Sequence, residues 1–63
     1  MPIAQLYIAE GRNEAQKKQL IEKVTQAFVE ALGTPADSVW ITVQDVPKTQ
    51  WGIGGKTLAE RSK

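Results

Sequence analysis

The chain has 63 residues, with eight Lys or Arg, seven Asp or Glu, and neither histidine nor cysteine. A net charge of +1 disfavours a nucleic-acid partner. The missing residue types exclude disulfides, thiolate metal sites and the commonest general base. The chain lacks an apolar run long enough for a membrane span, and Gln5 and Glu10 interrupt its one signal-like stretch. We expect one soluble cytoplasmic domain over residues 1–63, which gains its core by oligomerising.

The first predicted element is a strand over residues 2–8, which is apolar at nearly every position, as in strands covered on both faces. Asn13 and Gln16 then form a capping-box pattern that begins a helix. Gly33 followed by Pro35 ends it. The apolar positions between them repeat with helical spacing and predict one apolar face: Leu20, Ile21, Val24, Ala27, Phe28, Ala31 and Leu32.

A second strand is predicted over residues 39–46, where apolar and polar side chains alternate before Pro47. Strand, helix and strand in this order form a βαβ unit with parallel strands and a right-handed crossover. The predicted class is α+β: a single βαβ unit followed by a short C-terminal hairpin or turn. A two-stranded sheet leaves two edges and one face open, so we expect two copies to join their sheets, in a dimer or a larger symmetric ring.

The C-terminal stretch WGIGGKT, residues 51–57, contains a Gly-Lys-Thr triplet typical of a phosphate-binding loop. That loop needs another glycine five positions before Gly55, where this chain has Gln50. The dinucleotide-binding fingerprint fails as well, because Thr57 stands where its third glycine belongs. The stretch is therefore predicted to be a turn or hairpin and not a nucleotide site.

Pro2 is the residue best suited to proton transfer, because removal of Met1 would expose a secondary amine at the chain end. Removal of the initiator methionine is expected before a residue as small as proline. A terminal amine has a reference pKa of about 7.7–8.0, and an apolar pocket or a nearby cation lowers it. Such an amine can act as a general base near neutral pH. Taken alone, a proline at this position is ordinary, so its role depends on the rest of the pattern.

Four segments of the chain occur together in one known family: PIAQ at residues 2–5, EGR at 10–12, QK at 16–17 and GIGG at 52–55. On these segments the chain resembles 4-oxalocrotonate tautomerase, the small-subunit type of the tautomerase superfamily, over essentially its whole length. The resemblance implies βαβ subunits that form homohexamers, as trimers of dimers, without any metal or organic cofactor. It also implies an isomerase in which Pro2 moves a proton from the enol oxygen of a small 2-hydroxydienoate, such as 2-hydroxymuconate, to a carbon. The product is the conjugated 2-oxo acid.

Three further residues receive site roles from this resemblance. Arg12 matches the arginine that binds the substrate carboxylate with two parallel donors, although a surface charge after a turn would look the same. Trp51 stands where the family has an aromatic residue that walls the pocket, a position that an interface anchor would also suit. Trp40 departs from the pattern, because the best-known members have an arginine there that polarises the 2-oxo group from a neighbouring subunit.

Because of Trp40, the identity of the substrate stays undetermined. An indole N–H donates one neutral hydrogen bond, which is weaker than one from a guanidinium. Lys56 and Arg61 are candidates to supply the missing charge. The alternatives are a slower or promiscuous enzyme, an arylenolpyruvate tautomerase, a non-catalytic oligomeric module, or a binder of small carboxylates. The resemblance also disfavours the reactions of related dehalogenases and decarboxylases, because Ala9 and Ile53 stand where it implies a second arginine and a water-activating acid.

Overall fold

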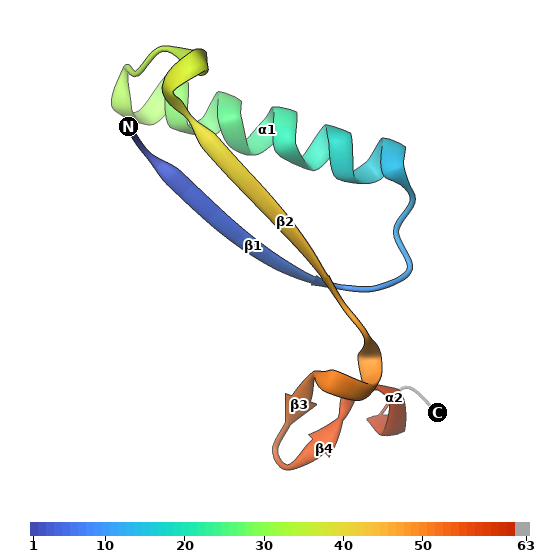
Figure 1. Cartoon of the computed structure of the whole chain (residues 1–63). Coiled ribbons are helices and arrows are strands. Elements are labelled where there is room, and N and C mark those ends of the chain that lie inside the picture. Colours follow the sequence, from blue (N-terminus) through green and yellow to red (C-terminus); the bar gives the residue numbers. More distant parts are fainter. Residues whose placement is uncertain (62–63) are drawn as a thin grey trace.

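The computed structural model describes residues 1–61 and shows a βαβ unit followed by a C-terminal arm (Figure 1). Strand β1 spans Ile3–Ala9, helix α1 spans Glu14–Leu32 and strand β2 spans Trp40–Val46. A 3₁₀ turn over Ala36–Ser38 leads into β2. Helix α1 lies across one face of the sheet, as Figure 1 shows. The predicted βαβ order is confirmed.

The two strands pair in parallel, with Ile3 opposite Trp40 at one end and Ala9 opposite Val46 at the other. This pairing confirms the predicted parallel arrangement. Both strands begin one residue later than the sequence pattern predicted. At β1 the reason is that Pro2 has no N–H to donate to a ladder. Its carbonyl oxygen nevertheless accepts the N–H of Trp40 at 3.0 Å, so Pro2 is still held against β2.

Local hydrogen bonds fix both ends of α1. The side-chain oxygen of Asn13 accepts the N–H of Gln16 at 2.8 Å, and Gln16 Oε1 accepts the N–H of Asn13 at 3.0 Å. This is the predicted capping box. At the other end Gly33 has φ 67° and ψ 22°, and its N–H donates to the carbonyl oxygen of Val29 at 3.0 Å. Glycine adopts this left-handed conformation without a steric cost, so the predicted helix end is confirmed as well.

The sheet has one face toward α1 and one open face. Side chains on the open face are exposed, and they come from alternate positions of both strands: Ile3, Gln5, Tyr7, Trp40, Thr42 and Gln44. Among them Ile3, Tyr7 and Trp40 are 56%, 63% and 53% exposed. The cover on both faces that the apolar pattern of β1 predicted is therefore missing within the single chain.

Residues 47–61 form the arm, which extends from the end of β2 away from the βαβ unit (Figure 1). Its elements are a 3₁₀ turn over Lys48–Gln50, strands β3 (Gly52–Ile53) and β4 (Lys56–Thr57), and helix α2 (Leu58–Arg61). Strands β3 and β4 pair antiparallel around Gly54 and Gly55, whose φ values of 62° and 88° suit a tight hairpin. The N–H of Leu58 donates to the carbonyl oxygen of Trp51 at 2.7 Å. The predicted C-terminal hairpin is confirmed.

The described part of the chain has no fully buried side chain. Its Cα radius of gyration is 14.5 Å, whereas a compact chain of this length would have about 11 Å. Its accessible surface is 4838 Å², compared with about 4,000 Å² for a folded monomer of 6.9 kDa. Folding must bury enough apolar surface to offset the lost chain entropy. The described chain therefore leaves more surface exposed than a compact monomer of its size would.

Among residues 1–61, no helix is both long enough and apolar enough to span a membrane.

Candidate active site

Pro2 and Trp40 lie side by side at the end of the sheet where both strands begin. The backbone hydrogen bond from Trp40 to Pro2 joins them, and Pro2 is half-buried while the Trp40 side chain lies on the open face. Met1 is 79% exposed and precedes Pro2 through a peptide bond. An amide nitrogen has no basic lone pair, so the Pro2 nitrogen becomes a base only when Met1 is removed.

Arg12 lies beyond the opposite end of β1. The strand has seven residues, and at about 3.3 Å per residue its ends are about 20 Å apart. Gly11 has φ 123°, which side chains rarely adopt, and it turns the chain out of the strand. Arg12 Nη1 then donates to the carbonyl oxygen of Ala9 at 3.1 Å. The single chain therefore does not bring Arg12 and Pro2 together.

Trp51 lies on the arm and is half-buried there. The arm leaves from the end of β2 that is farther from the N-terminus (Figure 1). The length of the sheet therefore separates Trp51 from Pro2. The predicted site residues thus occupy three places: Pro2 with Trp40, Arg12 alone, and Trp51 on the arm. One chain carries the parts of the predicted site without assembling them.

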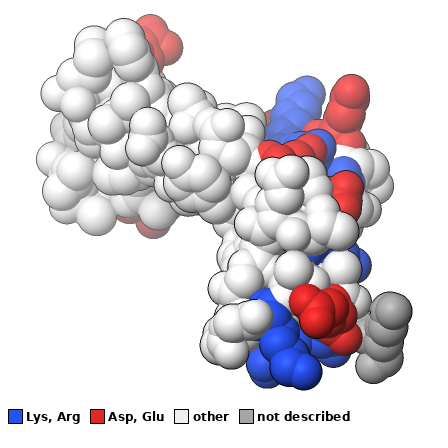
Figure 2. Space-filling view, turned by 60° about the horizontal axis from the view of Figure 1, so that its bottom comes forward, with Lys and Arg blue, Asp and Glu red and all other residues white. Residues whose placement is uncertain are grey.

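Arg12 stands between two neighbouring cavities at the end of the βαβ unit from which the arm leaves. One, which we name the Arg12 corner, has a volume of about 350 Å³ and is lined by Glu10, Gly11, Arg12, Gln16 and Lys48. The other has a volume of about 290 Å³ and is lined by Ile8, Arg12, Gln16, Lys17, Gln19 and Leu20. In Figure 2 charged side chains gather over this end and over the arm, whereas the opposite end is mostly uncharged.

Hydrogen bonds tie the Arg12 corner to the start of the arm. The N–H of Glu10 donates to the carbonyl oxygen of Val46 at 3.0 Å, and Glu10 Oε2 accepts the N–H of Lys48 at 3.1 Å. Close by, Lys17 forms an ion pair with Asp45. Sequence reasoning missed Lys48, because a lysine after a proline has no signature of its own. The predicted parallel pairing could have revealed it, because parallel strands end at the same edge of a sheet.

Lys56 and Arg61, the cations considered in place of the missing arginine, belong to β4 and α2 of the arm. Neither lines the Arg12 corner or its neighbouring cavity. The structure therefore gives neither residue a place beside Arg12.

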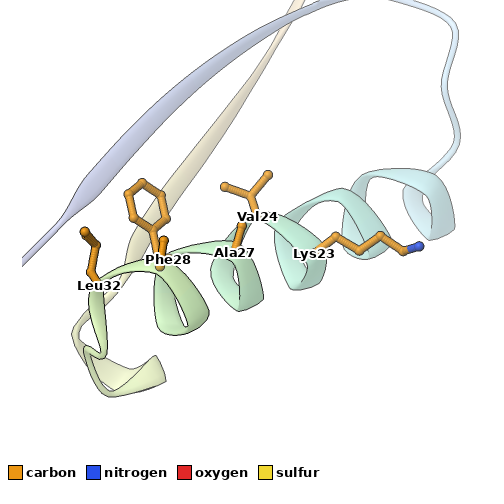
Figure 3. A pocket seen from close by; sticks show the side chains of 6 residues that line it. Lys23, Val24, Ala27, Phe28 and Leu32 are labelled. Carbon is orange, nitrogen blue, oxygen red and sulfur yellow. The ribbon is translucent and has the colours of Figure 1, made fainter.

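A further cavity of about 440 Å³ runs along α1 and is lined by Lys23, Val24, Ala27, Phe28, Ala31 and Leu32. Figure 3 shows Val24, Phe28 and Leu32 projecting from the side of the helix on which the strands lie. Apart from Lys23 the lining is apolar, and no carboxylate belongs to it. The groove is therefore a surface for packing. Its lining contains no carboxylate that could take part in the proton transfer expected of Pro2.

The pKa of the Glu60 carboxyl lies below its usual value, because the N–H and the hydroxyl of Thr57 both donate to it. These hydrogen bonds to Glu60 Oε1 measure 3.0 Å and 2.9 Å. The N–H of Glu60 donates back to the Thr57 hydroxyl at 3.1 Å, which completes a capping box for α2. No cluster of carboxylates suited to a metal ion occurs within residues 1–61.

The parallel βαβ unit with its C-terminal hairpin is the fold of solved 4-oxalocrotonate tautomerases. The chain belongs to the tautomerase family, because residues 2–61 match the family described as Tautomerase enzyme. A 2-hydroxymuconate tautomerase of Pseudomonas putida is 57% identical to it over 60 residues, which are 95% of each chain. The family confirms the prediction that the chain is an isomerase of the keto–enol tautomerase type.

Solved structures agree with this assignment. A 4-oxalocrotonate tautomerase isozyme from Methylibium petroleiphilum has a TM-score of 0.94 at 50% identity, covering 98% of this chain and 100% of that one. A heterohexamer 4-oxalocrotonate tautomerase from Chloroflexus aurantiacus J-10-fl has a TM-score of 0.91 at 33% identity, covering 95% and 97%. The predicted tautomerase fold is confirmed.

Proposed function

We propose that the chain, once Met1 is removed, converts a 2-hydroxydienoate such as 2-hydroxymuconate to the conjugated 2-oxo acid without a cofactor. The observation that carries this proposal is the position of Pro2, which is half-buried at the start of β1 and held by the N–H of Trp40. The Pseudomonas putida relative is named for 2-hydroxymuconate, which supports the substrate class.

In the proposed reaction the nitrogen of Pro2 accepts the proton of the enol hydroxyl. The O–H bond breaks, the C=O bond forms, and the π electrons shift along the diene. The protonated amine then delivers the proton to the terminal carbon of the diene, so the amine ends as it began and no electrons are gained or lost. A positioned base of this kind contributes about 10²–10⁴-fold to the rate. Arg12 binds a substrate carboxylate through parallel N–H groups.

The proposed site is shared between copies of the chain. A hexadienedioate is far shorter than the distance of about 20 Å between the ends of β1, so one substrate cannot contact Pro2 and Arg12 of the same chain. Antiparallel pairing of the open edges of two β1 strands would place Pro2 of one copy near Arg12 of the other and would make a four-stranded sheet. The arm would carry Trp51 to a neighbouring copy.

A homohexamer, built as a trimer of dimers, is the proposed assembly. The open face of the sheet and the apolar groove along α1 are surfaces that further copies would cover. No side chain among residues 1–61 is fully buried within the single chain, which supports the proposal that other copies cover these surfaces. The Chloroflexus aurantiacus relative, which is named a heterohexamer, supports the same number of subunits.

An arylenolpyruvate is the second candidate substrate. Trp40, which is 53% exposed beside Pro2, favours it, because the side chain offers an aromatic face in place of a positive charge. An aryl group could stack there, whereas a second carboxylate would gain one neutral N–H donor at most.

The test is kcat/KM for ketonisation of 2-hydroxymuconate, followed by ultraviolet absorbance, on protein whose intact mass shows that Met1 is gone. A value of about 10⁶–10⁸ M⁻¹s⁻¹ would support the first substrate. A value several orders of magnitude lower, with faster turnover of phenylenolpyruvate, would support the second. Protein that retains Met1 is the control and should be inactive. No turnover of either compound by the Met1-free protein would refute both proposed substrates.

A further inference from the structure

We propose that Lys48 supplies a second positive charge at the carboxylate subsite of Arg12, so that the two side chains hold one substrate carboxylate together. The inference rests on the proposed function for the role of Arg12 and adds a binding residue to it. Both side chains line the same cavity of about 350 Å³. The proposal also provides a cation to a chain in which Trp40 stands at the position where the family resemblance implies an arginine.

The fold fixes the backbone of Lys48 beside the end of β1. Parallel pairing brings Ala9 and Val46 opposite each other, and the next residue, Glu10, continues the ladder with its N–H on the carbonyl oxygen of Val46. The Glu10 carboxylate then accepts the N–H of Lys48 at 3.1 Å. Lys48 begins the 3₁₀ turn of the arm and is half-buried. The position of Lys48 in the Arg12 corner is therefore held by the two hydrogen bonds of Glu10, one to Val46 and one to Lys48 itself.

The charges of this corner leave both cations available to an anion. Nearby, Lys17 is paired with Asp45. Within residues 1–61 neither Arg12 nor Lys48 has a carboxylate at ion-pair distance. The carboxylate of Glu10 lines the same cavity, so the charges of Glu10, Arg12 and Lys48 add to one net positive charge. A bound carboxylate would neutralise it.

Gln16 completes the set of donors around the cavity. Its Oε1 accepts the N–H of Asn13 in the capping box, so the acceptor of this amide is already engaged. The Gln16 amide nitrogen can donate to a further oxygen, and the residue lines both cavities next to Arg12. A guanidinium, an ammonium and an amide around one opening form a subsite for a carboxylate.

The test compares Lys48→Gln with wild-type protein by isothermal titration with trans,trans-muconate, a dicarboxylate without the hydroxyl that the reaction needs. A hydrogen bond to a charged group is stronger than one between neutral groups, so we expect Kd to rise at least about 10-fold. Lys48→Arg should restore binding. Lys18→Gln removes the same charge from an exposed position of α1 outside both cavities and should leave Kd unchanged.

Glu10→Gln should change the Kd for muconate in the opposite direction. The glutamine oxygen can still accept the N–H of Lys48, while the loss of a negative charge should tighten muconate binding a few-fold. In turnover assays Lys48→Gln should raise KM for 2-hydroxymuconate and leave kcat nearly unchanged, which a general loss of structure would not do.

An unchanged Kd for Lys48→Gln would overturn the proposal, as would an equal weakening by Lys18→Gln. Binding that depends on Lys48 in a protein that turns over neither substrate would uphold this subsite and refute the proposed function. The two ideas can therefore fail separately.

Discussion

The N–H of Trp40 donates a 3.0 Å hydrogen bond to the carbonyl oxygen of Pro2, so the residue that departs from the family pattern is joined directly to the proposed base. The bond belongs to the backbone, and any residue except proline at position 40 can keep it. The pairing of Ile3 with Trp40 likewise holds this position in place. Substitutions of Trp40 therefore test the side chain without removing the contact that holds Pro2.

Trp40→Arg should raise kcat/KM for 2-hydroxymuconate by about 10²-fold, because a charged donor stabilises the negative charge that develops on the substrate oxygen. The same substitution should lower kcat/KM for phenylenolpyruvate, because the aromatic face is lost. Ultraviolet assays of both substrates measure the two effects. Trp40→Gln is the matched control, with a neutral donor and no ring. Equal gains from Arg and Gln would contradict a role for the charge.

Pro2→Ala should lower kcat for the tautomerisation by about 10²–10⁴-fold. The substitution replaces the rigid secondary amine with a primary amine on a residue that is not confined by a ring. Intact mass must show that Met1 is removed from both proteins, and light scattering must show the same assembly. A kcat equal to the wild-type value, with assembly unchanged, would show that the base does not need the proline ring.

Stability should depend on protein concentration, because the described chain buries no side chain completely by itself. Association that stabilises only the folded state shifts unfolding by mass action. Thermal unfolding at several concentrations should therefore give a midpoint that rises with concentration. Size-exclusion chromatography with light scattering should find a multiple of the protomer mass. A stable folded monomer would contradict the shared site.

The capping box of α2 should give a small stability gain that depends on pH. Hydrogen bonds from Thr57 lower the pKa of Glu60 in the folded arm below its unfolded value. A lowered pKa means that the gain is fully present above the unfolded pKa, about 4.3 for a glutamate, and is lost as pH falls through the folded pKa. Carbon-detected NMR titration measures the pKa of Glu60 in the folded protein. Thr57→Val removes the hydroxyl donor and keeps the N–H, so the pKa should rise part of the way.

The elements that follow from local chemistry could be predicted from the sequence. The ends of α1 depend on Asn13, Gln16 and Gly33, whose hydrogen bonds and dihedral angles involve near neighbours only. The parallel sheet followed from the order of strand, helix and strand. The hairpin or turn at Gly54 and Gly55 followed from the glycine-rich stretch of residues 51–57. Each prediction needed information from a few adjacent residues or from chain order.

The arrangement of the site could not be predicted in the same way. Pro2, Arg12 and Trp51 were grouped by a family resemblance, whereas the single chain keeps them at separate places because β1 and the arm hold them apart. Their meeting depends on surfaces between copies, which the sequence of one chain does not describe. Lys48 was missed for a related reason, because its position beside Arg12 depends on hydrogen bonds between residues 10 and 48.

The separation of Pro2 and Arg12 along β1 affects how duplicated genes for this protein could diverge. Under the proposed shared site, each copy donates the base to one site and the carboxylate clamp to another. After a gene duplication, one copy could lose its proline and the other its arginine, and a mixed assembly would still contain complete sites. The seven residues of β1 thus make a division of labour between sister genes possible without any change to the fold.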